Sequence, residues 1–474
     1  MFIMKKLILL ICLCWASIQI MGQIDAHYWT HQYGAKGLLL NGAVIASADD
    51  ETSIFYNPAC IGQGNDLGFV FSYLTPTYSS LQTRNFTGNG SFFRDDDLGF
   101  APGFAAVRFK PFKTDKIIMG VASFERLASS IRYDDRVVLP VQDFEDIFYV
   151  GDLEFDRSLS QEWLGVGLSY NVNPEFGVGV TQFSVWHSEN TRLDFNKEGK
   201  PLADPERVVF GWQNNFSYGI SAYGGWITKI GFIWTKPDAK IGLTFTSPMY
   251  GLIHKNANYD LHEQRILAGN LITTSNNRSI DLNTFKTPPS IGLGFEFNLE
   301  DELIVSFSTE YFNPIPEYTI FEDLDDPYDG LPDSPESTTV KLTTSNNAVI
   351  NFALGFRRIV SEKTTWLWGF RTDFNQDNTL KINELSEFLS TSPGVIHLSG
   401  GVKFKSKRNK ISLGLDYGYG RKSGGRQLTD LSDVNIFNFF SFGSERNVNT
   451  SQHSVMIFLT YDFLFGRIQD VDEN

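Results

Sequence analysis

The sequence predicts an all-β protein, a 14-stranded antiparallel transmembrane β-barrel closed by an N-terminal plug segment. Three observations support this prediction: apolar residues alternate in segments of about ten residues, short and long connections alternate between them, and the composition is aromatic without helical spans. The chain holds 41 Phe and 41 Gly, with 14% aromatic residues, yet its mean hydropathy is −0.17. This balance is typical of strands that show one face to lipid and the other to water.

The chain begins with a segment that has the features of an export signal. Residues 1–22 start with Lys5 and Lys6, continue with an apolar stretch from Leu7 to Ile20, and end in a small residue at Gly22. The stretch is shorter than the ~20 residues of a spanning helix, so we expect a cleavable signal peptide. Only Cys60 remains after its removal, which excludes an internal disulfide.

The strand pattern is clearest between Glu162 and Val172. Every second residue of this segment is apolar, a period of two that only a strand produces. Ten residues also match the length that a tilted strand needs to cross a bilayer, about 9–11 residues. The outward row is formed by Leu164, Val166, Leu168, Tyr170 and Val172.

Six short turns divide the chain into hairpins and so give the strand count. Six hairpins give twelve strands, and Leu67–Thr75 and Ser454–Phe465 add one at each end, which makes fourteen. Short periplasmic turns with long outer loops are typical of bacterial outer-membrane barrels. We therefore expect a barrel over 66–465, followed by an acidic tail over 466–474. The turns lie at 112–115, 173–174, 236–238, 298–301, 360–363 and 405–409, and the long segments at 76–100, 127–161, 188–224, 248–288, 313–347, 376–394 and 421–453.

The charged residues of the expected strands lie on the face opposite the apolar row. A basic residue turned to lipid at the bilayer midplane costs ~2–4 kcal/mol, and a slip of one residue would reverse every facing. A soluble β-propeller or sandwich would also alternate, but it does not explain the alternation of short and long connections. The inward charges are Arg108, Lys110, Lys229, Glu296, Glu310, Arg357, Arg371, Asp373, Lys403, Asp416 and Asp462.

Residues 23–65 do not alternate, and about forty residues are enough to fold into the lumen as a plug. Gly37 and Gly42 permit close backbone approach and unusual dihedral angles. Asp49 and Asp50 are well placed to cap a short turn or helix. Pro58 fixes its own φ while Asn57 bonds to the backbone beyond it, so Asn57-Pro58-Ala59 predicts a turn.

In these three elements the chain resembles the FadL/TodX family of outer-membrane transporters of long-chain fatty acids and other hydrophobic compounds. The small-residue run is Gly37-Leu-Leu-Leu-Asn-Gly42-Ala43, followed by Asp49-Asp50 and by Asn57-Pro58-Ala59. Leu39 stands where a second glycine is usual, and Phe465 is followed by the acidic tail instead of ending the chain. The resemblance implies a monomer in the outer membrane that contacts lipid and carries a hydrophobic small molecule, such as a long-chain fatty acid.

The resemblance also implies that the plug shifts and the ligand leaves sideways through a kink in the third strand. That strand is expected at Asp115–Arg126, where Gly120 and Ala122 face inward and leave the stretch without bulky side chains. Glycine inside a strand often marks a bulge or bend, so the lateral opening is expected near Gly120. The alternative is that Gly120 is only one of many small lumen residues.

Two further groups are candidates for ligand binding. Leu252, Leu261 and Leu267 belong to an apolar stretch in the fourth outer segment, where the spacing also allows an amphipathic helix; a loop with its own small core is the alternative. Arg357 and Arg371 face the lumen from the tenth and eleventh strands as expected neighbours, and a guanidinium pair would hold a carboxylate. Internal pairing with Asp373 or with plug acids is the alternative.

Other functions find little support in the sequence. A formal net charge of −15 disfavours nucleic acid as a partner. We find no catalytic constellation, and we expect no enzyme activity, cofactor or metal; the acidic run around Asp323 has Pro327 where a calcium loop needs a ligand. Two other barrel functions stay open: a secretion-accessory barrel of the PorV type that docks exported proteins, and a porin for polar solutes, which the plug disfavours.

Overall fold

The computed structural model describes residues 27–467 with several internal gaps, and the statements below concern this part of the chain. The expected signal peptide at 1–22, the tail beyond residue 467 and most of the acidic outer run lie outside it, so these stay predictions. The gaps are 65, 73–74, 101–102, 113, 142–143, 254–255, 268–269, 282–284, 301, 324–339, 377–378, 383–385, 390–391, 407–408 and 433–444.

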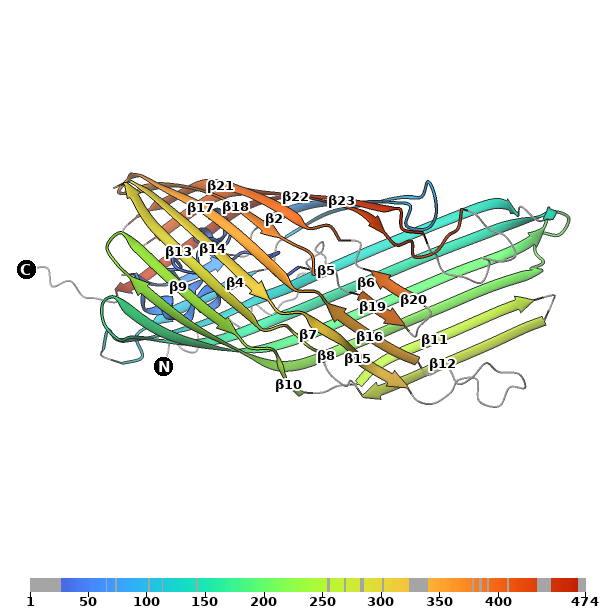
Figure 1. The fold of residues 1–474 in the computed structure, drawn as a ribbon, viewed down its shortest axis with the longest axis horizontal. Coiled ribbons are helices and arrows are strands. Elements are labelled where there is room, and N and C mark those ends of the chain that lie inside the picture. The colour runs from blue at the N-terminus through green and yellow to red at the C-terminus, as the bar shows by residue number, and fades with distance from the viewer. Residues whose placement is uncertain are drawn as a thin grey trace, which may run out of the picture.

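The strands form a closed antiparallel barrel of fourteen wall strands, as the sequence predicted (Figure 1). Asp66 pairs with Arg467, which joins the first strand to the last. Four wall strands consist of consecutive elements: β1 (Asp66–Ser72) with β2 (Pro76–Arg84), β3 (Phe92–Phe100) with β4 (Phe104–Phe109), β9 (Ala239–Thr246) with β10 (Tyr250–Ile253) and β11 (Asn256–Leu267), and β12 (Asn270–Asp281) with β13 (Ser290–Glu300).

The other wall strands are continuous, and four short strands form a second sheet. The continuous strands are β5 (Ile117–Val141), β6 (Phe144–Asn171), β7 (Phe176–Pro201), β8 (Phe210–Thr235), β14 (Leu303–Phe312), β17 (Val349–Ser361), β18 (Thr364–Asp373), β21 (Val395–Lys405), β22 (Asn409–Gly425) and β23 (Val448–Arg467). The small sheet contains β15 (Ile315–Asp323), β16 (Val340–Asn346), β19 (Thr379–Ile382) and β20 (Ser386–Leu389). The six short turns all lie where the sequence placed them, between the ends of paired strands.

The facing of the strands agrees with the lipid argument. Outward apolar residues such as Val166 and Leu168 are exposed, which suits contact with acyl chains. The inward charges that the structure buries are Arg108, Lys229, Glu296, Glu310, Arg371, Asp373, Asp416 and Asp462. None of the helices in the described ranges is long and apolar enough to cross a bilayer.

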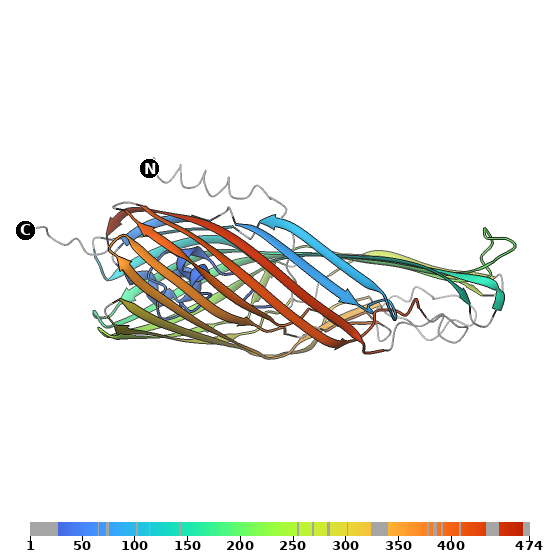
Figure 2. The same ribbon diagram turned by 90° about the horizontal axis from the view of Figure 1, so that it is seen from above.

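The expectation of long outer loops is wrong for a large part of the chain. β5 to β8 contain 25, 28, 26 and 26 residues, more than twice the 9–11 that a bilayer needs. Their outer parts, together with β11 and β12, form a sheet that continues beyond the barrel, which we call the outer blade (Figures 1 and 2). The outer blade lies beyond the barrel, so we expect no lipid against either of its faces. Apolar and polar residues therefore need not alternate strictly along its strands, although the hydrogen bonds between the strands continue.

The amphipathic helix considered in the fourth outer segment is therefore absent as well. Leu261 and Leu267 belong to β11, which pairs with β12 residue by residue from Asn256 to Leu267. Leu252 belongs to β10. The side chains of these three leucines lie outside the described part of the structure, and their role in ligand binding stays a prediction.

The N-terminal segment lies inside the barrel, as predicted. Residues 27–64 are almost entirely buried, and Figure 2 shows them in dark blue within the lumen. This plug contains α2 (Gly34–Leu39), α3 (Ser53–Tyr56) and the 3-10 helix η1 (Pro58–Gly62).

Candidate ligand path past the plug

The glycines of the plug motif are required by close packing. A Cβ atom on Gly37 would lie 2.4 Å from the Tyr56 hydroxyl oxygen. Gly42 has a φ of +82° and lies against the side-chain amide of Gln32. Larger residues at either position would displace a neighbour, and at Gly42 they would also strain the backbone.

Of the capping residues predicted from the sequence, Asp50 and Asn57 act as expected, whereas the Asp49 carboxylate pairs with Lys36. A carboxylate oxygen of Asp50 accepts a hydrogen bond from the Thr52 backbone N–H at 3.0 Å. The Asn57 side-chain oxygen accepts one from the Ala59 N–H at 3.1 Å, and Pro58 begins η1. The Asn57 amide also donates to the carbonyl oxygens of Ile45 in the plug and Phe232 in the wall. Asn57-Pro58-Ala59 therefore shapes the plug and fastens it to β8.

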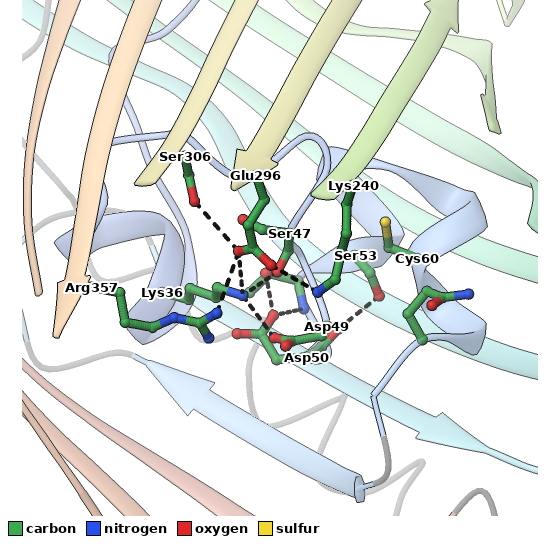
Figure 3. A network of polar contacts seen from close by, with 12 residues as sticks. Lys36, Ser47, Asp49, Asp50, Ser53, Cys60, Lys240, Glu296, Ser306 and Arg357 are labelled. Carbon is green, nitrogen blue, oxygen red and sulfur yellow. Dashed lines mark hydrogen bonds and ion pairs between the residues drawn. The ribbon is translucent and has the colours of Figure 1, made fainter. Parts of the chain in front are cut away.

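An ionic network joins the plug to one side of the wall (Figure 3). Lys36 Nζ lies 3.0 Å from an Asp49 oxygen and 3.9 Å from Glu296 of β13. Lys240 and Arg357 approach Glu296 at 2.8 and 3.4 Å. Burial raises the pKa of the Asp49 carboxyl, but the cations of Lys36, Lys240 and Arg357 hold it well below its ordinary value. Every cation of this network therefore has a carboxylate partner.

The two arginines proposed as neighbours are separated in the structure. Arg357 lies opposite Leu367, whereas Arg371 lies opposite Ala353, so four residues of register separate them, roughly 13 Å along the strands. Arg371 donates hydrogen bonds to the Asn41 side chain and to the Thr30 carbonyl oxygen in the plug. The expected adjacency is wrong, and internal pairing occupies both side chains.

Arg108 of β4 fastens the end of the plug to the start of the barrel. Its guanidinium is buried and donates to four carbonyl oxygens, those of Ile61, Gln63, Asp49 and Asp66, at 2.7 to 3.1 Å. A single planar cation with several donors suits this task. The sequence identified Arg108 only as a lumen charge, because its partners lie more than forty residues away.

An apolar and aromatic cluster connects the small outer sheet to the plug. Phe321 of the small sheet lies 6.1 Å from Tyr218 of β8, measured between ring centroids. At the inner end, Trp163 lies 4.9 Å from Phe183. We call this cluster the aromatic path. Its remaining buried members are Tyr33, Ile54, Ile61, Leu67, Val70, Phe104, Ala106, Ile118, Ala122, Phe124, Val185, Phe216, Ile220, Ile227, Met249, Tyr259, Ile320 and Leu342.

The wall is continuous at Gly120 and interrupted further along β5. Gly120 pairs with Arg108 on one side and Gly167 on the other, and its Cα faces Ile54 of the plug. Ala122 is likewise paired on both sides. The register of β5 with β6 shifts between Glu125 and Leu127, which makes Arg126 the extra residue of a β-bulge.

Beyond this bulge β5 pairs with β6 alone among the described residues, although Phe93 of β3 still packs on Tyr133 of β5 at 5.2 Å between ring centroids. The pairing of β4 with β5 ends at Phe104 and Phe124, and β3 pairs with β2. One edge of β5 outside Phe124 therefore has no strand partner among the described residues. The interruption lies six residues beyond Gly120, so the function of Gly120 in an opening stays a prediction.

No family model and no curated protein sequence matches the chain. Solved structures do. The toluene transporter TbuX of Ralstonia pickettii is 15% identical, with 92% of this chain and 98% of that chain covered and a TM-score of 0.55. The chain has the fold of the FadL/TodX outer-membrane channels.

Two other solved structures with the FadL/TodX fold agree with it over nearly the same length. A Pseudomonas aeruginosa FadL homologue is 12% identical, with 92% and 99% of the two chains covered and a TM-score of 0.55. The toluene transporter TodX of Pseudomonas putida is 11% identical, with 88% and 94% covered and a TM-score of 0.52. At these identities the likeness establishes the fold alone. The functional residues must be identified from the sequence and structure of this chain.

Within this FadL/TodX fold, sequence reasoning missed several residues that meet where the plug touches the aromatic path. Tyr33 donates from its hydroxyl to the Glu125 carbonyl oxygen at 2.7 Å, and Phe55 lies beneath the cations of Arg126 and Lys229. The only available signal was that Tyr33 begins the glycine run and that Phe55 precedes the Asn-Pro turn. Neither position reveals a contact with a strand about 70 to 170 residues away.

Proposed function

We propose that this chain lies in the bacterial outer membrane as a monomer and carries hydrophobic compounds past its plug, with long-chain fatty acids or similar amphipathic molecules as substrates. The aromatic path is the observation that supports this function. It offers apolar contact from the small outer sheet to the plug, through side chains that are buried together. A hydrophobic ligand gains about 0.8 kcal/mol for each CH₂ group that leaves water, so it would follow this path in preference to a wet pore.

We further propose that release is lateral and occurs beside the bulge of β5. The aromatic path reaches the wall at Phe104 and Phe124, which is also the level at which β5 loses its pairing with β4. A ligand that leaves there passes directly into lipid. The toluene transporters with the same fold are named for hydrophobic substrates, which supports the class of compound but not the choice between fatty acid and aromatic hydrocarbon.

Uptake by cells tests this function. Cells that lack their own channel of this kind would express the full chain, and the entry of labelled palmitate and labelled toluene would be measured beside that of a polar sugar. We expect faster entry of at least one hydrophobic compound and no change for the sugar. Faster sugar entry alone would identify a polar porin and contradict the proposal.

Docking of exported proteins is the second candidate function, and the outer blade favours it. The outer blade carries a broad polar surface with two shallow hollows of about 440 and 310 Å³, both lined mainly by Asp, Asn, Arg and Ser or Gln side chains. Replacement of the outer parts of β5–β8, β11 and β12 by short turns would separate the two functions. Loss of protein secretion with retained uptake would favour docking, whereas the transport proposal expects uptake to depend on the barrel and plug.

A further inference from the structure

The two faces of the outer blade differ in chemistry. Side chains of its inward face, such as Leu153, Leu193 and Trp212, are buried in one hydrophobic cluster. Its outward face is polar. Every outward residue from Ser130 to Arg136 of β5, and every residue paired in register with these across β6, β7, β8 and β11, is polar or glycine.

This polar face continues the surface that contacts lipid lower on the same strands. On β6, Val166 and Leu168 are exposed apolar residues of the outward row, and Leu164 is the last apolar residue before a polar run that includes Glu154. Leu164 and Glu154 are roughly 33 Å apart along the strand, or about 25 Å along the membrane normal at the usual strand tilt. The head-group layer is only about 5–8 Å thick on each side. Glu154 therefore lies beyond the head groups and points sideways from the barrel axis (Figures 1 and 2).

The two hollows of the outer blade lie on this face, and neighbouring side chains hold their polar groups in place. Glu154 borders both hollows, Asn190 lies in the larger and Asp194 and Asn215 in the smaller. The Asn215 amide donates a hydrogen bond to an Asp194 oxygen at 2.9 Å and accepts one from Gln213 at 3.1 Å. Side chains that are fixed in this way lose little freedom when a ligand binds.

The composition of this face favours a hydroxyl-rich, uncharged ligand. Carboxylate oxygens accept hydrogen bonds and side-chain amides both donate and accept them, which matches the hydroxyl groups of a sugar. A protein partner is usually anchored by aromatic or other large side chains, and this stretch of the face presents none outward. The face is also acidic, so an anionic ligand would be repelled. Against three arginines, its acids are Asp134, Asp152, Glu154, Asp156, Asp194 and Asp260.

We infer that the outward face of the outer blade binds uncharged saccharide chains of glycolipids that stand in the outer leaflet beside the barrel. A face that points sideways above the lipid meets chains rooted in the same membrane. Asp134, Glu154 and Asp194 lie directly opposite one another on three strands, an arrangement of like charges that destabilises a sheet. Sugar hydroxyl groups that donate to these carboxylates would offset this cost. The inference requires the outer-membrane location and does not depend on what passes through the lumen.

Binding measurements on the full chain test this site. The chain would be kept in a polyoxyethylene detergent, which has no sugar head group that could compete. The probes would be saccharide chains released by mild acid from the outer membrane of the native host, separated into an uncharged and an anionic fraction and labelled for fluorescence anisotropy. We expect the dissociation constant of the uncharged fraction to be lower than that of the anionic fraction by about tenfold or more.

Three variants separate hydrogen bonding from charge. Asn190→Ala with Asn215→Ala removes one amide from each hollow without a change of charge, and the dissociation constant of the uncharged fraction should rise about tenfold or more. Asn298→Ala removes an exposed amide beside the turn after β13 and is the matched control, which should bind both fractions as the native chain does. Glu154→Gln with Asp156→Asn keeps oxygen acceptors but removes two charges, so the anionic fraction should bind more tightly than it binds the native chain.

The inference fails if the native chain does not bind the uncharged fraction or prefers the anionic one. It also fails if the Asn190→Ala, Asn215→Ala variant binds the uncharged fraction as tightly as the native chain. Retention of an exported protein that this variant loses, with no saccharide bound, would assign the face to protein docking instead. Uptake of a hydrophobic compound should be equal in the native chain and all three variants, so loss of the saccharide site leaves the transport proposal standing.

Discussion

The plug meets the wall in two places that differ in their charge balance. On the side of Glu296, three cations and two carboxylates form a closed network at distances of 2.8 to 3.9 Å. On the side of Phe55, Arg126 and Lys229 form no ion pair with a described carboxylate. The comparison suggests a division of function. The cations near Glu296 fasten the plug to the wall through carboxylates, whereas the two cations at Phe55 contact the plug through its ring.

Arg108→Gln should produce the largest loss of plug stability, because glutamine cannot reach all four carbonyl oxygens that Arg108 serves from β4. Loss of several hydrogen bonds to a buried charge should cost about 4 kcal/mol of plug stability. We expect a raised ion conductance of the purified chain in planar bilayers, as the plug opens more often. Arg94→Gln, at an exposed arginine of β3, is the control and should leave conductance unchanged. If the Arg108→Gln variant had the same ion conductance as the native chain, the contacts of Arg108 with the carbonyl oxygens would not hold the plug.

Glu296→Gln should weaken the contact between β13 and the plug by a smaller amount. The substitution keeps the size of the side chain but leaves Lys240 and Arg357 without a carboxylate, while Lys36 retains Asp49. Removal of one partner from a buried ion pair costs about 3 kcal/mol. Hydrogen exchange should become faster at the plug amides of residues 36–49. Unchanged exchange at these amides would show that Glu296 does not help to hold the plug.

How much of the fold and of the candidate site the sequence predicts depends on the environment of each segment. The turns and the strands of the membrane belt were predicted because lipid enforces a period of two on residues such as Val166 and Leu168. The capping by Asp50 and Asn57 was predicted because each acts on backbone within two residues. The outer blade was missed because no lipid contacts it, and the bulge at Arg126 because one extra residue reverses the facing of the strand without a local sequence signal.

The long-range partners were beyond sequence reasoning for a different reason. Lys36 and Glu296 are 260 positions apart, and only the closure of the barrel around the plug brings them together. The same holds for Arg126 and Lys229, which meet at a ring from a third segment. Arg357 and Arg371 show the opposite case, since adjacent strands were predicted correctly but the register separated the side chains.

Acid should act on the holding side through Asp49, and only at low pH. The pKa of Asp49 lies well below its ordinary value of 3.8, because the neighbouring cations outweigh the effect of burial. A depressed pKa contributes stability that is fully present above the ordinary pKa and is lost as the pH falls through the lower, folded value. The Asp49→Asn variant should therefore have a lower hydrogen-exchange protection of the plug amides than the native chain. The difference in protection should be constant between about pH 5 and 8. A difference that disappears already at about pH 6 would place the titrating group elsewhere.

Tyr33→Phe should give the smallest effect on stability and should act on the path side alone. It removes the one hydrogen bond from the plug to the carbonyl oxygen before the bulge and keeps the ring stacked with Phe104, so the cost should be about 1 kcal/mol. Because this bond joins the plug to the interrupted edge of β5, we expect faster entry of a hydrophobic substrate in the uptake assay, with unchanged ion conductance. Tyr78→Phe, which removes an exposed hydroxyl paired with Asp96, is the matched control. Raised conductance in Tyr33→Phe would mean that this bond helps to hold the plug, and the two sides would then not be distinct.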